Sequence, residues 1–161
     1  MSSHSDLFLK IEGSRQGAIK GESKATGKTG VIEIGSWSWG MDSSDVSSAQ
    51  AKSKANSKNI VVSKLFNASS TAIMSALRSG EMLKSVVISV RDSYDSTPTD
   101  TLSVTLKKAF VVSYDLVSTS GESGRPMENI SFSFKEIEVV YVSKSDKMTK
   151  NVTHTFTDQY D

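Results

Sequence analysis

Short segments in which apolar and polar residues alternate recur along most of this chain, and they limit what it can fold into. Apolar residues occupy every second position in 7–11, 86–90, 102–106 and 130–134. A period of two places those side chains on one face of an extended strand. About seven or eight such strands, separated by polar turns, predict a mainly β (α+β) protein that forms a closed or nearly closed β-barrel or a β-sandwich.

One segment departs from this period. Within residues 68–81 the apolar side chains return at helical spacing, at Ala72, Ile73, Ala76 and Leu77. Asn67, Ser69 or Ser70 can cap the start of a helix, and Gly80 can end it. We expect one helix that flanks the barrel on its apolar stripe and leaves the side with Ser70, Ser75 and Arg78 exposed.

Both tryptophans lie in one stretch, GESKATGKTGVIEIGSWSWG at residues 21–40. Trp37 and Trp39 share one strand face, whereas Ile32 and Ile34 share the other, which predicts a bulge or sharp bend at Gly35. A second change of parity, near residues 135–136, predicts another corner. The two indoles belong either to the core or to a docking surface, and the core is the favoured interpretation.

Composition bounds the class of protein. The chain has 161 residues, no cysteine and a formal net charge of +1. Its length fits a single domain over 1–161, and its charge gives no general attraction for nucleic acid. The polar tract at about 42–59 predicts a mobile loop. Neither a signal peptide nor a membrane-spanning segment is visible, so we expect a cytoplasmic start, no membrane insertion, and any release by a route that does not use a signal peptide.

Signals of catalysis are weak. GKTG at 27–30 ends like a phosphate-binding loop but lacks the earlier glycine and precedes a strand instead of a helix. His4 and His154 could form a poor metal site with Asp6 and Asp158, and a serine triad with His154 has no identifying motif. Glu128 stands at a strand start, where a structural ion pair is expected. We therefore predict no enzyme activity, no metal and no cofactor.

Several motifs, in this order, resemble the haemolysin-coregulated protein (Hcp) family. They are LFLKIEG (7–13), KGES (20–23), IEIGSWSWG (32–40), ASSTAIMSALRSGE (68–81), VVISVRD (86–92) and PMENISFSFKEIEVVY (126–141). The positions that carry the core and the family motifs are Gly21, Glu22, Ser23, Trp37, Trp39, Gly40, Glu128, Phe132 and Phe134. The chain departs from the common pattern in the extra stretch GSRQGAIK (13–20) and in Thr26-Gly27-Lys28, where a His-Lys element is frequent.

The resemblance implies a compact, phage-tail-tube-like β-barrel of two packed antiparallel sheets with one flanking helix, which serves as the inner tube of the bacterial type VI secretion system. Six copies would form a ring, and stacked rings would be expelled with effectors, in contact with spike and sheath components. The protein would be found in the cytoplasm and released without a cleaved signal peptide. Candidate residues for the contacts between subunits are Asp42, Asp45, Lys52, Lys54 and Lys58.

A function of another class remains open at this point. The chain could be a monomeric β-sandwich binding module or chaperone that uses Trp37 and Trp39 as a platform. This alternative requires both indoles to be exposed in the free protein.

Overall fold

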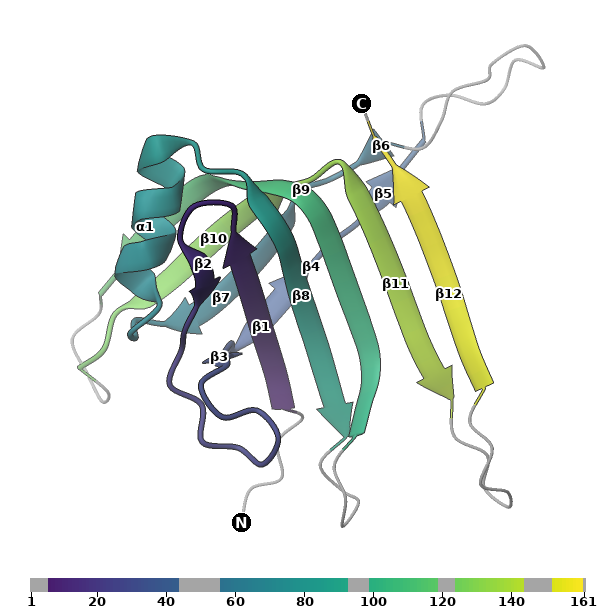
Figure 1. Ribbon diagram of the computed structural model, residues 1–161, viewed down its shortest axis with the longest axis horizontal. Helices are drawn as coiled ribbons and strands as arrows, with labels where there is room; N and C mark the ends of the chain where they lie inside the picture. Colours follow the sequence, from purple (N-terminus) through teal and green to yellow (C-terminus); the bar gives the residue numbers. More distant parts are fainter. Residues whose placement is uncertain (1–5, 44–55, 93–98, 119–123, 144–151, 161) are drawn as a thin grey trace.

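The computed structural model describes residues 6–43, 56–92, 99–118, 124–143 and 152–160. Within these ranges nearly every element is a strand (Figure 1). The elements are β1 (Asp6–Gly13), β2 (Gly17–Ile19), β3 (Ile32–Glu33), β4 (Ser36–Ser38), β5 (Met41–Asp42), β6 (Asn56–Ser57), β7 (Ile60–Leu65), α1 (Ser70–Ser79), β8 (Leu83–Asp92), β9 (Thr99–Val117), β10 (Met127–Ser133), β11 (Glu136–Ser143) and β12 (Val152–Gln159).

Two antiparallel sheets share strand β9. The first sheet has the order β2-β1-β8-β9 and continues through β11 to β12, and the second has the order β9-β10-β7-β4. The sequence predicted separate strands at 102–106 and from Ala109 onward, and this was wrong, because β9 is a single strand of 19 residues. It bends at Lys108, where φ is 52°. Because of this bend, the N-terminal part of β9 pairs with β8 and its C-terminal part pairs with β10.

The segment around Gly35 closes the barrel. β3 pairs with β1 of the first sheet, and β4 pairs with β7 of the second. At the junction the Ile34 N–H donates to the Leu7 carbonyl at 3.1 Å and the Gly35 N–H donates to the Ser63 carbonyl at 2.8 Å. The chain therefore passes from one sheet to the other at the predicted bend. The corner near 135 has the same role between β10 and β11, and the predicted β-barrel of two sheets is confirmed.

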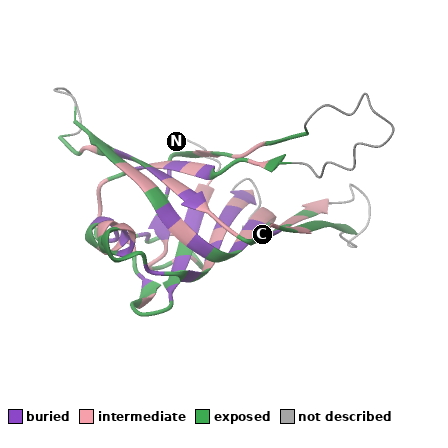
Figure 2. Cartoon of the chain, turned by 90° about the horizontal axis from the view of Figure 1, so that it is seen from above, coloured by how far each residue is buried: buried purple, intermediate pink, exposed green. Residues whose placement is uncertain are grey.

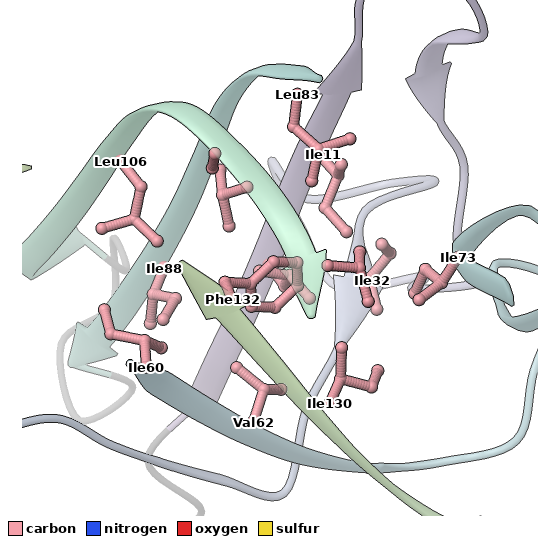
Figure 3. Packing of buried hydrophobic residues seen from close by; sticks show 14 of the residues in the cluster. Ile11, Ile32, Ile60, Val62, Ile73, Leu83, Ile88, Leu106, Ile130 and Phe132 are labelled. Atoms are coloured by element: carbon pink, nitrogen blue, oxygen red, sulfur yellow. The ribbon is translucent and has the colours of Figure 1, made fainter. Parts of the chain in front are cut away.

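The space between the sheets is filled by aliphatic side chains and Phe132 (Figure 3). Helix α1 covers one end with buried Ile73 and Ala76. Gly80 ends the helix with φ of 68°, a left-handed conformation that glycine adopts without strain. The expectation that Ser70 is exposed was wrong: Ser70 is fully buried because its hydroxyl belongs to a polar cluster inside the protein.

Three pieces project from the barrel (Figures 1 and 2). We call β11 and β12 the wing, which extends the first sheet beyond the barrel. We call the paired residues of β9 and β10, Phe110–Val117 and Met127–Ser133, the tongue: its base helps to enclose the core, and its far end leaves on the opposite side. The ladder of β5 and β6 forms an arm on the side of the wing. This ladder joins the two ends of the tract predicted as a mobile loop, and residues 44–55 of that tract lie outside the described residues.

Candidate assembly surfaces

Lys64 and Glu128 form an ion pair inside the barrel. They face each other across β7 and β10, and both side chains are completely buried. The alternation that points Ile60 and Val62 inward also points Lys64 inward, at the end of β7. Desolvation is the largest influence on Lys64 and lowers the pKa of its amine, against the opposing effect of Glu128. The ion pair expected at Glu128 therefore has its partner in the second sheet.

Polar groups lie beside both members of this pair. The Lys64 ammonium donates to the Leu65 carbonyl at 3.2 Å, to Asn67 Oδ1 at 3.1 Å and to Ser70 Oγ at 3.1 Å. The Tyr114 hydroxyl donates to the second carboxylate oxygen of Glu128. Burial, followed by this carboxylate, raises the pKa of Tyr114. The cluster joins β7, α1, β9 and β10, so its chemistry is structural and its charges are occupied.

The GES motif positions a loop beside the helix. Ser23 is buried and its hydroxyl accepts the Ala25 N–H at 3.1 Å, while Glu22 accepts the Ala68 N–H at 2.6 Å just before α1. At Gly21 a Cβ atom would lie 2.6 Å from the Cα atom of Ile32. Glycine is required here because two backbone segments cross at this point.

The two departures from the family pattern both have structural partners. The stretch 13–20 supplies the turn and the second strand of the β1–β2 hairpin. Glu81 holds the turn, since the N–H groups of Arg15 and Gln16 each donate to Glu81 Oε2 at 2.8 Å. The Thr26 carbonyl accepts from Arg91, and Lys28 pairs with Asp100 at 3.0 Å.

Phe8 lies beneath the cationic groups of Arg91 and Lys28. Its ring is 2% exposed although it points away from the main core. The Arg91 guanidinium lies 5.0 Å and the Lys28 ammonium 5.5 Å from the ring centroid. Both are within the range of cation–π attraction. Lys28 of the GKTG stretch thus covers an aromatic ring beside its ion pair.

Both tryptophans are partly buried and pack against the core. The Trp39 indole donates to Ser57 Oγ at 3.0 Å, and its ring lies 6.5 Å from that of Phe156. The neighbouring Gly40 has room for a Cβ, which would meet its nearest atom at 3.6 Å. A platform of exposed indoles is not what the structure presents, and this speaks against the monomeric binding module.

The remaining predicted positions divide between the core and the arm. Phe132 is fully buried, and Phe134 packs edge-on against Tyr160 with ring centroids 5.9 Å apart. Among the candidates for contacts between subunits, Asp42 is exposed on the arm and Lys58 is exposed directly after it. Asp45, Lys52 and Lys54 lie outside the described residues.

The outer face of the second sheet is rich in serine and nearly uncharged. Ser36 lies opposite Ser63, which lies opposite Asn129, and Ser131 lies opposite Ser113 in the ladder. We call this surface the serine face. Across the paired residues of β4, β7, β10 and β9 on that side, Asp115 is the single charged residue. The residues of the serine face are Ser36, Ser38, Ser63, Ser113, Asn129, Ser131 and Ser133.

The backbone ladders leave edges unpaired in the described part of the chain. The second sheet ends at β4 on one side and at the C-terminal half of β9 on the other, and the first sheet ends at β12. β12 is exposed over most of its length and carries three threonines but neither lysine nor proline. Native edge strands are usually protected by charged residues or proline, and Asp158 is the one carboxylate on β12, so this edge remains open to a partner strand.

Groups suited to catalysis do not gather in the described residues. No cluster of three or more histidines and carboxylates there could hold a metal ion. His154 Nε2 lies 3.4 Å from Ser143 Oγ, on an exposed strand pair, and its ring stacks on Tyr141 at 6.1 Å. The described part of the chain contains no helix with the length and hydropathy of a membrane span.

Fold and surface together define a small β-barrel protein whose distinctive features are open sheet edges and projecting strand pairs. A family model described as "Type VI secretion system effector, Hcp" matches residues 8–141. The chain therefore belongs to the Hcp family and is a protein of the type VI secretion system, as the sequence motifs predicted. No curated protein sequence matches the chain significantly.

Solved structures agree on the fold. A type six secretion system protein superposes with a TM-score of 0.83 at 20% identity, over 97% of this chain and 96% of its own. A mutant of Hcp1 from an E. coli pathovar gives 0.78 at 18% identity, over 98% and 99%. Hcp1 from Salmonella typhimurium gives 0.76 at 21% identity, over 96% and 95%.

Proposed function

We propose that this chain is a non-enzymatic subunit of the type VI inner tube, in which six copies form a ring and rings stack. The observation that carries the proposal is the second sheet, which within the described residues has two unpaired edge strands and one face with Asp115 as its single charged residue. Copies placed side by side can continue this sheet from β9 of one to β4 of the next. Such a head-to-tail contact closes into a ring when the rotation from one subunit to the next is a whole fraction of a full turn.

The serine face is the surface that suits the lumen of this tube. Its hydroxyl groups stay hydrated and offer weak hydrogen bonds, and it carries little charge that would hold or repel a protein cargo. The other face of the same sheet is the barrel core and is not available. Effectors would therefore travel in loose contact with this face, and the filled tube would be expelled from the cytoplasm through the sheath behind the spike.

Ring formation is tested by light scattering and negative-stain microscopy of the purified chain. The proposal expects a mass of six subunits and rings with a central hole. A mass of one subunit at high protein concentration and low salt would contradict it.

The lumen is tested separately by charging the serine face. Ser131→Arg should leave ring formation intact and reduce the amount of effector that copurifies with the ring. Ser75→Arg, on the exposed side of α1, is the matched control and should change neither. Equal cargo in both variants would place the effectors elsewhere on the ring.

A further inference from the structure

The exposed apolar side chains of this protein are gathered at two places. Ten large apolar residues among those described have 38–53% of their surface exposed. Met82 stands apart, and the other nine lie either at the tongue or on the wing and the neighbouring arm. The tongue group is Leu65, Val112, Leu116, Val117 and Met127, and the wing group is Met41, Tyr141, Val152 and Phe156.

The tongue is apolar on both of its faces. Leu116 lies opposite Glu128 and so shares the face that becomes the barrel core, while Val117 and Met127 lie opposite each other on the face that carries the serines. Leu116 is 48% and Val117 47% exposed. A strand pair that exposes apolar side chains on two sides has the pattern of an inner layer that lacks its covering layers.

The wing continues the inner surface of the barrel into solvent. Its pairing with β9 places Val139 opposite Val104 and Tyr141 opposite Leu102, and Val104 is buried in the core. By the same register Phe156 lies opposite Val139. Phe156 touches Trp39 at the barrel end of this row, but Tyr141 and Val152 farther out are 48% and 53% exposed. This face of the wing is therefore built as a core face, and the described residues leave its outer part uncovered.

We propose that the wing of one copy covers the tongue of the next copy on the face that carries Leu116, opposite the serine face, so that two half-built layers complete a core at each subunit boundary. The inference rests on the proposed ring, since it assigns the surfaces that hold neighbouring copies together. Figures 1 and 2 show the tongue and the wing leaving the barrel on opposite sides. Two unlike surfaces on opposite sides can meet only head to tail, which is the arrangement that closes a ring.

A second copy of this chain is the occupant that the two surfaces and the open edge favour. The tongue and the wing both expose apolar side chains on the face that continues the barrel core, so each can supply the layer that the other lacks. The described edge of β12 adjoins the same apolar face of the wing and can pair with a further strand. A ring of identical subunits supplies one such partner for every wing.

Cysteine cross-linking tests which surfaces meet, and the natural chain contains no cysteine to interfere. The variant Leu116→Cys/Tyr141→Cys is treated with a short bis-maleimide after its ring has been verified by light scattering. A head-to-tail contact between tongue and wing yields a ladder from dimers up to the full ring on a denaturing gel. Leu116→Cys alone and Tyr141→Cys alone should give no ladder. The control Ser75→Cys/Met82→Cys, exposed outside both groups, should also give none.

Substitution provides the second readout. Leu116→Lys should lower the fraction of assembled protein about tenfold or more at a given concentration, because it brings an ammonium group into an apolar contact. Met82→Lys, at a matched exposed apolar residue, should leave assembly unchanged. Thermal melting of both variants as monomers checks that the fold survives.

The outcomes separate the two proposals. Rings that form without the tongue–wing ladder, or with an equal ladder in the control pair, would overturn the inference while leaving the tube function standing. Cross-linked dimers from either single-cysteine variant would show a symmetric contact and overturn it too. A wild-type chain that stays monomeric would overturn both.

Discussion

Lys64 and Glu128 neutralise each other inside the barrel, with neither side chain reaching solvent. A buried ion pair of this kind adds little net stability because both charges are desolvated, yet removing one partner leaves the other uncompensated. The ion pair acts instead on how the two strands align. Since Lys64 can satisfy its charge only opposite Glu128, the pair disfavours any other register of β7 against β10.

Removing one member of the pair should destabilise the protein strongly. Lys64→Met or Glu128→Leu alone is expected to lower the free energy of unfolding by about 3–5 kcal/mol. The double variant should recover most of that loss, since no unpaired charge remains. Chemical denaturation of the four proteins checks the cycle. A double variant with the summed loss of the two singles would contradict the idea that the pair acts as a unit.

The Tyr114 hydroxyl should make stability sensitive to alkaline pH. Its pKa in the folded protein is raised above the ordinary value of 10.0 by burial and by Glu128. The stabilisation from its protonated form is therefore complete below pH 10 and is lost as the pH rises above 10, where the unfolded chain ionises first. The difference in unfolding free energy between wild type and Tyr114→Phe should shrink above pH 10. A constant difference would show that Tyr114 ionises normally.

Glu81 should have the opposite pH dependence. Its burial favours the neutral form, but the hydrogen bonds from Gln16 and Arg15 outweigh burial and lower the pKa of the carboxyl below its ordinary value of 4.5. The stabilisation is present above pH 4.5 and is lost as the pH falls through the lowered pKa. Glu81→Gln should cost about 1–3 kcal/mol at neutral pH and remove this acid dependence. Glu12→Gln, at an exposed carboxylate, is the control, and thermal melting between pH 2 and 7 is the measurement, with roughly one-unit pH steps.

Alternation was sufficient to predict most strands, the helix and both corners, because buried faces impose a period of two or of 3.6. The division of β9 into two strands was the main error. Apolar residues change parity between Leu106 and Ala109. This change is expected both where one strand ends and another begins and where a single strand bends. Lys108 bends without a glycine, so residue type gave no signal at that point.

The surfaces were less predictable than the core. The inward parity of Lys64, after Ile60 and Val62, was a signal in the sequence that could have identified the partner of Glu128. Arg91 could not be found in this way, because its burial depends on the loop that ends at Val31 folding back over Phe8. The apolar residues of the tongue have the pattern of ordinary strand positions, and only the structure shows that none of the described elements covers them.

Gly21 and Gly35 should respond differently to the addition of one methyl group. A Cβ at Gly21 would lie 2.6 Å from the Ile32 Cα atom and 2.7 Å from the Val31 carbonyl oxygen, so backbone must move. At Gly35 the nearest atom is 3.6 Å away, which is an ordinary contact. Gly21→Ala is expected to cost about 1–3 kcal/mol, as overpacking does, and Gly35→Ala less than about 0.5 kcal/mol. Equal melting temperatures for the two variants would contradict this assignment.

Lys108 should be replaceable by glycine with a gain in stability. Its φ of 52° is unfavourable by about 1–2 kcal/mol for a residue with a Cβ. Glycine avoids that strain, offset by its larger entropy in the unfolded chain and by the loss of the exposed Lys108–Glu136 pair at 3.3 Å. Lys108→Gly is thus expected to be neutral or stabilising by up to about 1 kcal/mol. Lys108→Val, which loses the same pair but adds a branched Cβ, should be destabilising by about 1–2 kcal/mol. Denaturant titration ranks the three proteins, and a valine variant as stable as the glycine variant would show that the bend in β9 carries no strain.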